Sequence, residues 1–423
     1  MKFKYSGPIE SSKSIVNRAL ILSATFPNLK ISYESKAKDI LELKKSLDEF
    51  NKSQHTNLNT ESLKDSFGPS VFDLGSGGTT FRFFAIYVSK FKGQWVLEIS
   101  PQLAKRPHDG IVEILSQLGV KSNSYFNKKK PYFIIDSEGW AGHQVDVDFI
   151  KSSQFFSGLA LAAADSKNDF KINCLNRDQS SGYEAITLKL LKDIGCQVKD
   201  QNNVVVIKST QKLEKPVELN IGADWSSVIY LLSFCFSGSE IEITNLDLNS
   251  AEPDRKGLEF LKELGLNFEL KQGIHFYNVK TKPSEFKKYL KIMNLKYNPD
   301  LFPVMAILLS QIALVHNIEV AIEYPEQLIY KESDRLKHMI IVLGRIGFQI
   351  DSDLNTKRLI LKIKSSPKCD QLKKDEKFDF DSDSDHRLVM SYELLKSFGY
   401  NISYDKPESV KKSFSNFFEI VNG

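Results

Sequence analysis

Strongly apolar stretches recur along the chain, and each follows a short cluster of charged and hydroxyl residues. The six stretches are ALILSA, FFAIYV, FFSGLALAAA, LFPVMAILLS, HMIIVL and LVMSYELL. The clusters in front of them lie at 12–18, 75–82, 152–154, 299–300, 331–335 and 385–387. A helix that is apolar on all sides is buried, so each stretch predicts a helix in the middle of a domain.

The polar clusters predict where a ligand binds. A buried helix gains nothing from charged residues at its start, but its N-terminus has unpaired N–H groups and a partial positive charge that suit an anion. Several such helix ends carry Lys or Arg. They therefore indicate one large site for a strongly anionic small molecule, or for two of them.

A second pattern lies between the apolar stretches: an amphipathic helix that usually ends at Gly and is followed by a strand. The copies are ILELKKSLDEF, IVEILSQLGV, LKLLKDIGCQV, LEFLKELGLNF, MIIVLGRIGFQI and YELLKSFGYNI. Gly at the end of a helix predicts a left-handed cap. We therefore expect six divergent α/β units, three per domain, each with one buried and one half-exposed helix.

A chain of 423 residues is long enough for two domains. The pattern restarts at LNIGADWSSVIYLLSFCFSG, where Asp224 is placed to cap a helix. We expect residues 12–224 to form one domain, inserted into a second domain of residues 1–11 and 225–423. Two crossings between domains would act as a hinge for closure. The polar stretch 51–67 is expected to be a surface loop.

The composition of the chain argues against nucleic-acid binding, metal binding and a membrane location. The 57 Lys and Arg against 53 Asp and Glu give a net charge of +4, which is too balanced for a nucleic-acid partner. The four cysteines lack CxxC spacing and the seven histidines lack HxH or HExxH, so we expect neither disulfides nor a metal site. No apolar run is long enough for a membrane span, and the start lacks a signal-peptide core, so a cytoplasmic location is expected.

The residue types in the polar clusters suit anion binding and proton transfer. Lys is a compact donor whose pKa shifts in a closed site, and the guanidinium of Arg pairs with carboxylate or phosphate through two hydrogen bonds. Gly77 and Gly78 would let backbone N–H groups approach an anion closely. Asp300 and Glu332 could cap helices, but their electrostatic cost beside an anion site favours a chemical role.

Taken in order, these motifs resemble those of the 3-phosphoshikimate 1-carboxyvinyltransferase (EPSP synthase) family. The motifs are SKSIVNRALILSA, GSGGTTFR, KRP, SSQF, PDLFP, KESDR, DHR and KKSF. Each is weak alone, but together they follow the family's order over nearly the whole chain. The resemblance implies a two-domain α/β enolpyruvyl transferase fold. Each domain would be an inside-out α/β barrel of three repeated α/β units around buried central helices, with the active site in the cleft between the domains.

The resemblance also implies a reaction. The enolpyruvyl group of phosphoenolpyruvate would pass to the 5-hydroxyl of 3-phosphoshikimate, giving 5-enolpyruvylshikimate 3-phosphate and phosphate in the shikimate pathway. The chemistry would be addition followed by elimination, without metal or other cofactor. The partners would be the two small substrates, and we expect a monomer.

Residue roles are carried over from the resemblance position by position. The residues that it assigns to 3-phosphoshikimate are Lys13, Ser14, Arg18, Ser152, Ser153, Gln154, Ser180, Asp300 and Lys331. Those that it assigns to phosphoenolpyruvate are Lys13, Gly78, Arg106, Gln154, Arg335, Arg387 and Lys412. Asp300 is implied as the proton acceptor, and Glu332 and Lys13 are the candidates for the other proton transfers.

Some positions depart from the family pattern or leave a choice open. Ser76 stands where the family usually has Asn. Gly182 replaces a Pro, so Ser181 competes with Ser180, and Lys411 competes with Lys412.

Two other functions stay open. The related UDP-N-acetylglucosamine enolpyruvyl transferases typically carry an active-site Cys after the Gly-rich loop, whereas the first Cys of this chain is Cys174. The other alternative is a non-catalytic anion-binding module, against which the intact Lys13, Arg106, Asp300 and Glu332 argue.

Overall fold

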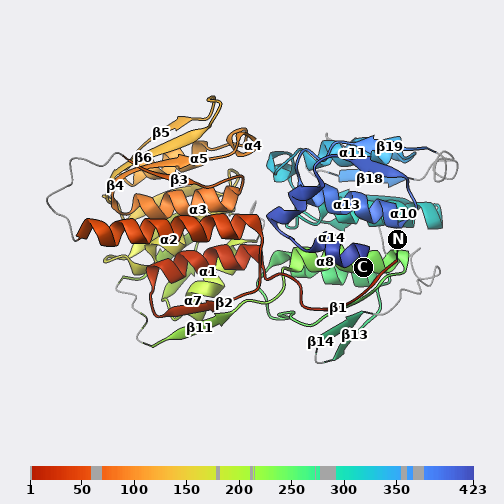
Figure 1. Ribbon diagram of the computed structural model, residues 1–423, viewed down its shortest axis with the longest axis horizontal. Coiled ribbons are helices and arrows are strands. Elements are labelled where there is room, and N and C mark those ends of the chain that lie inside the picture. The colour runs from red at the N-terminus through yellow and green to blue at the C-terminus, as the bar shows by residue number, and fades with distance from the viewer. Residues whose placement is uncertain are drawn as a thin grey trace. The chain divides into compact units, whose positions relative to one another are not determined.

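The chain divides into two compact units in the computed structural model, which describes residues 2–58, 69–177, 182–209, 213, 215–271, 273–276, 292–353, 360–364 and 376–423. The inserted unit is Ser11–Ile221, and the discontinuous unit combines Met1–Glu10 with Gly222–Gly423. The sequence pattern placed the two crossings near residues 12 and 224. Figure 1 shows the elements of each unit along the colour gradient.

The inserted unit alternates helices with short strands. Its helices are α1 (Lys13–Thr25), α2 (Lys38–Leu58), α3 (Gly78–Ser89), α4 (Pro101–Ala104), α5 (Asp109–Gln117), α6 (Ser153–Ala162) and α7 (Glu184–Asp193). Its strands are β2 (Leu29–Ser32), β3 (Ser70–Asp73), β4 (Lys92–Glu98), β5 (Lys121–Tyr125), β6 (Tyr132–Glu138), β7 (Gln144–Asp148), β8 (Phe170–Leu175), β9 (Val198–Gln201), β10 (Val204–Ile207) and β11 (Val217–Asn220).

The sheets of the inserted unit repeat one arrangement. The strand orders are β3-β4-β6-β5 and β7-β8-β10-β9, with a two-stranded sheet β11-β2. In each four-stranded sheet the first two strands are parallel and the rest are antiparallel. Parallel neighbours need a crossover, which α3 and α6 supply, and α5 and α7 lead into the antiparallel hairpins.

The discontinuous unit has the same alternation. Its helices are α8 (Trp225–Ser233), α9 (Gly257–Glu263), α10 (Phe302–His316), α11 (Arg335–Arg345), α13 (His386–Ser397) and α14 (Phe417–Asn422), with 3-10 helices that include η5 (Pro253–Lys256), η7 (Glu326–Tyr330) and η8 (Pro407–Lys412). Its strands are β1 (Lys4–Gly7), β12 (Glu240–Ile243), β13 (Phe268–Lys271), β14 (Gly273–Phe276), β15 (Met293–Asn294), β16 (Glu319–Glu323), β17 (Gln349–Asp353), β18 (Ile360–Lys364), β19 (Phe378–Phe380) and β20 (Ile402–Tyr404).

The pairing of β1 and of β11 accounts for the two chain crossings. The sheet orders of the discontinuous unit are β1-β12-β14-β13, β15-β16-β18-β17 and β19-β20. Strand β1 precedes α1 in sequence but pairs with β12, whereas β11 precedes α8 but pairs with β2. Each unit therefore completes a sheet with a strand from beyond its own helices, and the prediction of three α/β copies per domain is confirmed.

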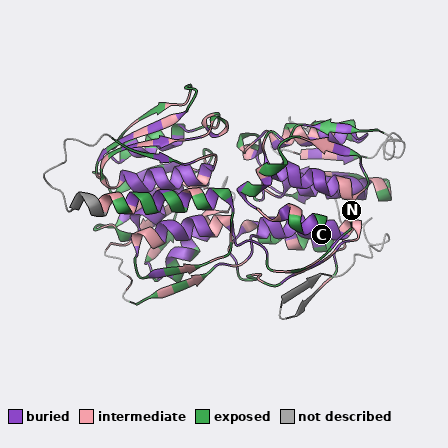
Figure 2. Ribbon diagram, viewed as in Figure 1, coloured by how far each residue is buried: buried purple, intermediate pink, exposed green. Residues whose placement is uncertain are grey.

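Six helices form the centres of the two units: α1, α3 and α6 in the inserted unit, and α8, α10 and α13 in the discontinuous unit. Residues 225–233 of α8 and 302–313 of α10 are all buried, and these helices are largely purple in Figure 2. Asp224 caps α8 by accepting from the Ser227 N–H at 2.8 Å, as predicted. None of the helices in the described part of the chain has the length and apolarity for a membrane crossing.

Three sequence expectations about helices were wrong. The residues YELL, expected in a half-exposed helix, lie in the central helix α13, whose residues 386–395 are all buried. The stretch HMIIVL lies in α11, which is half exposed, with Ile341 45% exposed. The sixth central helix is α8 instead, because charged residues on one face of α11 face solvent. Residues 51–58 continue α2 rather than forming a loop, since a polar composition does not separate an exposed helix from a loop. Residues 59–67 lie outside the described residues.

The glycines that follow the amphipathic helices adopt left-handed backbone, as predicted. The φ angles are +76° at Gly119, +88° at Gly195, +99° at Gly265, +101° at Gly347 and +96° at Gly399. A Cβ in this region clashes with the following carbonyl oxygen, which is why Gly is required there.

Gly399 and Gly344 separate this backbone effect from packing. A Cβ at either position would meet no atom within 4 Å, but only Gly399 has a positive φ. We expect Gly399→Ala to lower the free energy of unfolding by about 1–2 kcal/mol and Gly344→Ala, inside α11, to raise it by up to about 1 kcal/mol. Urea unfolding of the two variants checks this; equal shifts would contradict it.

Candidate active site

The candidate residues of the discontinuous unit gather around the buried guanidinium of Arg335. Its Nε donates to Asp385 Oδ2, its Nη1 to Asp300 Oδ1 and its Nη2 to Glu332 Oε2, each at 2.8 Å. Second bonds run from Nη2 to Asp385 Oδ1 at 3.3 Å and from Nη1 to the carbonyl oxygen of Pro299 at 3.4 Å. Burial opposes the charge, but the three carboxylates raise the pKa of Arg335 well above its ordinary value.

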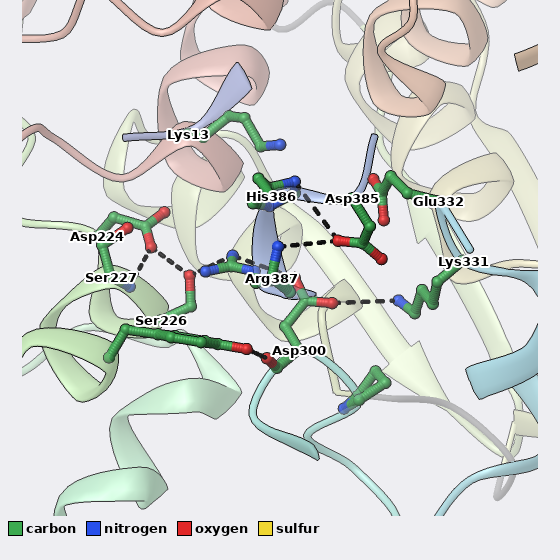
Figure 3. Close-up of polar contacts among 12 residues, drawn as sticks. Lys13, Asp224, Ser226, Ser227, Asp300, Lys331, Glu332, Asp385, His386 and Arg387 are labelled. Atoms are coloured by element: carbon green, nitrogen blue, oxygen red, sulfur yellow. Dashed lines mark hydrogen bonds and ion pairs between the residues drawn. The ribbon is translucent and has the colours of Figure 1, made fainter. Parts of the chain in front are cut away.

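Asp300 lies in the turn before α10 and faces three cations. Its Oδ1 is 2.8 Å from Arg335 Nη1. The same oxygen is 3.6 Å from Lys331 Nζ, and Oδ2 is 3.3 Å from Arg387 Nη2 (Figure 3). Burial raises the pKa of Asp300, but Lys331, Arg335 and Arg387 outweigh it and hold that pKa well below the usual range. Leu301, not Asp300, occupies the cap position of α10, so the carboxylate is not used as a helix cap.

Glu332 is not a helix cap either. The side chain of Asp334 caps α11 by accepting from the Lys337 N–H at 3.0 Å, whereas Glu332 pairs with Arg335. Both candidate carboxylates therefore belong to one charged cluster, which Figure 3 shows beside Asp385 and Lys331.

Arg387, in the first turn of α13, uses only part of its guanidinium for hydrogen bonds within the protein. Its Nη2 donates to Ser226 Oγ at 2.6 Å and to Asp300, and its guanidinium lies 5.4 Å from the ring centroid of Tyr230. Its Nε and Nη1 are buried without a hydrogen-bond partner. Unsatisfied donors on a buried cation are costly, so Arg387 is well placed to receive an anion.

The segment that carries Lys412 is held by the start of the chain. Lys412 ends η8 and is buried, whereas the neighbouring Lys411 is exposed. Three residues later, the N–H of Ser415 donates to Glu10 Oε2 at 3.3 Å, and Ser415 Oγ donates to Glu10 Oε1.

In the inserted unit, the start of α1 carries Lys13 and Arg18. Ser12 caps the helix by accepting from the Ile15 N–H at 3.2 Å. Lys13 Nζ lies 3.1 Å from Oδ2 of Asp39 in the first turn of α2. These contacts fix the direction of Lys13 from two helices.

Arg18 is buried and bound on several sides. Its Nε donates to Thr187 Oγ1 at 2.8 Å, its Nη1 to the carbonyl oxygen of Ser14 at 2.7 Å and its Nη2 to Ser157 Oγ at 3.1 Å. The guanidinium also lies 5.3 Å from the ring centroid of Phe83. Arg18 thus joins α1 to α6 and α7, and its assignment to 3-phosphoshikimate stays a prediction.

The Gly-rich loop and Arg106 meet at the start of α3. Gly77 is the cap residue and supplies no side-chain bond, so no cap side chain covers the first N–H groups of α3. A Cβ at Gly78 would lie 2.7 Å from Arg106 Nη1, and Arg106 Nε is buried without a partner. His108 Nε2 lies 2.8 Å from the carbonyl oxygen of Leu103, which holds the Arg106 loop, and burial lowers the pKa of His108 to about 4.

Gln154 links α6 to α3. Its Oε1 accepts from Arg82 Nη1 at 2.6 Å, and its Nε2 donates to Thr79 Oγ1 at 2.9 Å. Ser152 caps α6 by accepting from the Gln154 N–H at 3.1 Å, and Ser153 is buried beside it. Ser180 and its competitor Ser181 lie outside the described residues.

Several residues of the site were missed from sequence. Asp385 and Asp39 bind the candidate cations Arg335 and Lys13. Ser226 positions Arg387. Asp385 stands in the DHR motif at a helix start, which was the only signal, because the partner of a carboxylate distant in sequence is not readable from the pattern.

No metal site emerges from the described residues: they include no group of three or more His, Cys, Asp or Glu side chains arranged to hold a metal ion.

Comparisons with known proteins name the family. The family described as EPSP synthase (3-phosphoshikimate 1-carboxyvinyltransferase) matches residues 8–421. A 3-phosphoshikimate 1-carboxyvinyltransferase of Methanosarcina acetivorans is 28% identical over 419 residues, which cover 97% of this chain and 93% of the relative. The enzyme of the same name from Methanococcoides burtonii is 29% identical over 357 residues, 83% and 78% of the two chains.

Solved structures share the fold. EPSP synthase from Acinetobacter baumannii aligns with a TM-score of 0.64 at 20% identity, covering 100% of this chain and 95% of the other. The enolpyruvyl transferase NikO from Streptomyces tendae aligns with a TM-score of 0.68 at 12% identity and covers 100% and 95%. The predicted two-domain enolpyruvyl transferase fold is confirmed.

The Arg335 cluster predicts the cost of removing one of its charges. Asp385→Asn leaves a buried guanidinium short of one negative charge, which costs about 3–5 kcal/mol in free energy of unfolding. The control Asp379→Asn removes a carboxylate that is 73% exposed and should cost less than about 1 kcal/mol. Chemical denaturation of both variants gives the comparison. An Asp385→Asn protein as stable as the control would show that the cluster carries little energy.

Proposed function

The chain belongs to the EPSP synthase family, whose activity is that of a 3-phosphoshikimate 1-carboxyvinyltransferase, and we propose that the residues described above form its active site. The observation that supports this most directly is Asp300. Its carboxylate is kept ionised among three cations, one of which, Arg387, has two unpartnered nitrogens. A base beside a cation that can still donate hydrogen bonds to an anion is what the transfer requires.

The reaction transfers the enolpyruvyl group of phosphoenolpyruvate to the 5-hydroxyl of 3-phosphoshikimate. A proton added to the methylene carbon makes C2 electrophilic. The 5-hydroxyl oxygen then bonds to C2 and gives its proton to Asp300. Loss of a methyl proton and of phosphate from the tetrahedral intermediate restores the double bond. Glu332 and Lys13 are the candidates for these carbon and phosphate proton transfers.

Ligand binding would raise the pKa of Asp300 and so make its carboxylate a stronger base. In the free protein the cations depress its basicity, since they hold its pKa well below the usual range. The anionic groups of the substrates would compensate Arg387 and Lys331, and less positive potential at Asp300 raises its proton affinity. The base is therefore weak until both substrates supply their charge.

The binding roles divide by substrate. We assign Gly78, Arg106, Arg335, Arg387 and Lys412 to phosphoenolpyruvate. We assign Ser14, Arg18, Ser152, Ser153, Ser180 and Lys331 to 3-phosphoshikimate, and Lys13 and Gln154 to both. The burial of Lys412 and exposure of Lys411 support the choice between them. Arg335 has a carboxylate or carbonyl partner at every nitrogen, so it would reach its ligand only by releasing one.

The thiol-dependent alternative has no support among the described residues. Burial raises the pKa of Cys174 and of Cys196 to about 11. Both thiols lie on the sheet side of the inserted unit, in or next to β8 and β9, rather than in the segment directly after the Gly-rich loop.

An assay of phosphate release tests the function. The wild-type protein should release phosphate from phosphoenolpyruvate only when 3-phosphoshikimate is added, and not with UDP-N-acetylglucosamine. Release with the nucleotide sugar, or with neither acceptor, would contradict the proposal.

Asp300→Asn tests the base. Loss of a general base costs about 10²–10⁴-fold in turnover. The affinity for phosphoenolpyruvate should hold or rise, because a negative charge beside the anion site is removed. Steady-state kinetics and calorimetry measure the two quantities. Turnover within about threefold of wild type, under 1 kcal/mol in the barrier, would place the base elsewhere.

Gly78→Ala tests the phosphoenolpyruvate side. The added Cβ would lie 2.7 Å from Arg106 Nη1 and would displace the guanidinium. The Michaelis constant of phosphoenolpyruvate should therefore rise more than that of 3-phosphoshikimate. An equal rise in both constants would point to a general disturbance of the fold.

A further inference from the structure

Two carboxylates of α2 pack against the Gly-rich loop. A Cβ at Gly75 would lie 2.1 Å from Glu42 Oε1, and a Cβ at Gly77 would lie 2.9 Å from Asp39 Cγ. The two acids are three residues apart on one face of the helix, so both press on the same loop. The space that side chains at Gly75 and Gly77 would fill is thus taken up by Glu42, by Asp39 and by Thr80.

The two carboxylates differ in how their charge is compensated. Asp39 pairs with Lys13 at 3.1 Å, and its backbone oxygen accepts from Thr80 Oγ1 at 3.0 Å. Glu42 has Lys38 at 3.5 Å, whose side chain is 63% exposed, whereas the side chain of Lys13 is 16% exposed. Each acid also has one buried oxygen without a hydrogen-bond partner, Asp39 Oδ1 and Glu42 Oε2. Glu42 is therefore the less stabilised anion of the pair.

The surroundings of Glu42 favour its neutral form. Burial, the charge of Asp39 and that of Asp73 at the end of β3 raise the pKa of Glu42 to about 7, against the opposing effect of Lys38. Lys13 lies beyond Asp39 and is already paired with it. A carboxyl group with this pKa is partly protonated at neutral pH.

We propose that Glu42 is a proton-coupled positioning residue of the Gly-rich loop, which takes up a proton when an anion binds at Lys13 and the start of α3. This rests on the proposed role of that loop in holding phosphoenolpyruvate. The anion adds negative charge beside Asp39, Glu42 and Asp73. It also competes with Asp39 for the positive charge of Lys13. Protonation of Glu42, the less compensated of the two acids of α2, relieves the repulsion while the carboxyl group stays against Gly75.

Linkage fixes the direction of the pH effect. The bound form holds more protons than the free form, so affinity for the anion falls as pH rises above about 7. Between pH 7 and 8.5 we expect the Michaelis constant of phosphoenolpyruvate to rise about three- to fivefold in the wild-type protein. Phosphoenolpyruvate is about nine-tenths ionised at pH 7 and more so at pH 8.5, because the second pKa of a phosphate monoester is about 6. Its own ionisation therefore cannot weaken binding as pH rises.

Glu42→Gln distinguishes the protonation of Glu42 from the packing of its side chain against the loop. The amide copies the neutral acid, so the variant should bind phosphoenolpyruvate at pH 8.5 at least as tightly as at pH 7. The matched control is Glu49→Gln, which changes a Glu of the same helix whose side chain is 47% exposed. It should keep the wild-type pH dependence.

Calorimetry of phosphoenolpyruvate binding gives a second readout. Repeated at pH 7.5 in buffers of different ionisation enthalpy, it should show uptake of about half a proton in the wild-type and Glu49→Gln proteins. Uptake should vanish in Glu42→Gln. Wild-type protein that binds phosphoenolpyruvate without proton uptake would overturn the proposal, whatever the variants do.

Two further outcomes separate the alternatives. A Glu42→Gln protein that binds more weakly at every pH but keeps the wild-type pH slope would show a structural role and overturn the proton coupling. A wild-type protein that neither binds phosphoenolpyruvate nor releases phosphate from it would instead contradict the proposed function.

Discussion

The buried charge of Arg335 is the constraint on which the discontinuous unit depends. A guanidinium that is almost inaccessible to water is tolerated only when it is fully paired, because desolvation costs several kcal/mol per ion. Arg335 meets this condition with Asp385 at the start of α13, Asp300 before α10 and Glu332 before α11. One side chain therefore sets the positions of three helix starts, and two of its partners are the candidate catalytic carboxylates.

Buried guanidinium groups also join helices in the inserted unit. Arg18 and Arg82 are buried and donate to hydroxyls, carbonyls and the amide of Gln154. These bonds join α1 to α6 and α7, and α3 to α6. They therefore hold in place the helix starts that carry Lys13 and Gly78.

The sequence predicted what depends on local physics. Capping by Asp224 and the left-handed glycines after five amphipathic helices follow from the few residues around each helix end. The assignment of HMIIVL to a central helix was wrong. An apolar run of six residues does not show whether one face or both faces of its helix are covered by other elements. Partners distant in the chain were out of reach: Arg335 and Asp385 are 50 residues apart, and no pattern marks the pair.

The glycines of the Gly-rich loop are required by the packing of neighbouring side chains as well as by the predicted anion site. Gly77 and Gly78 were expected to let an anion approach the backbone, which stays a prediction. A Cβ at Gly75 would also meet Glu42, one at Gly77 would meet Thr80 and Asp39, and one at Gly78 would meet Arg106. The loop is therefore positioned by two acids on one side and a guanidinium on the other. Because an anion at this loop would change the balance of these charges, binding and protonation are coupled by the packing itself.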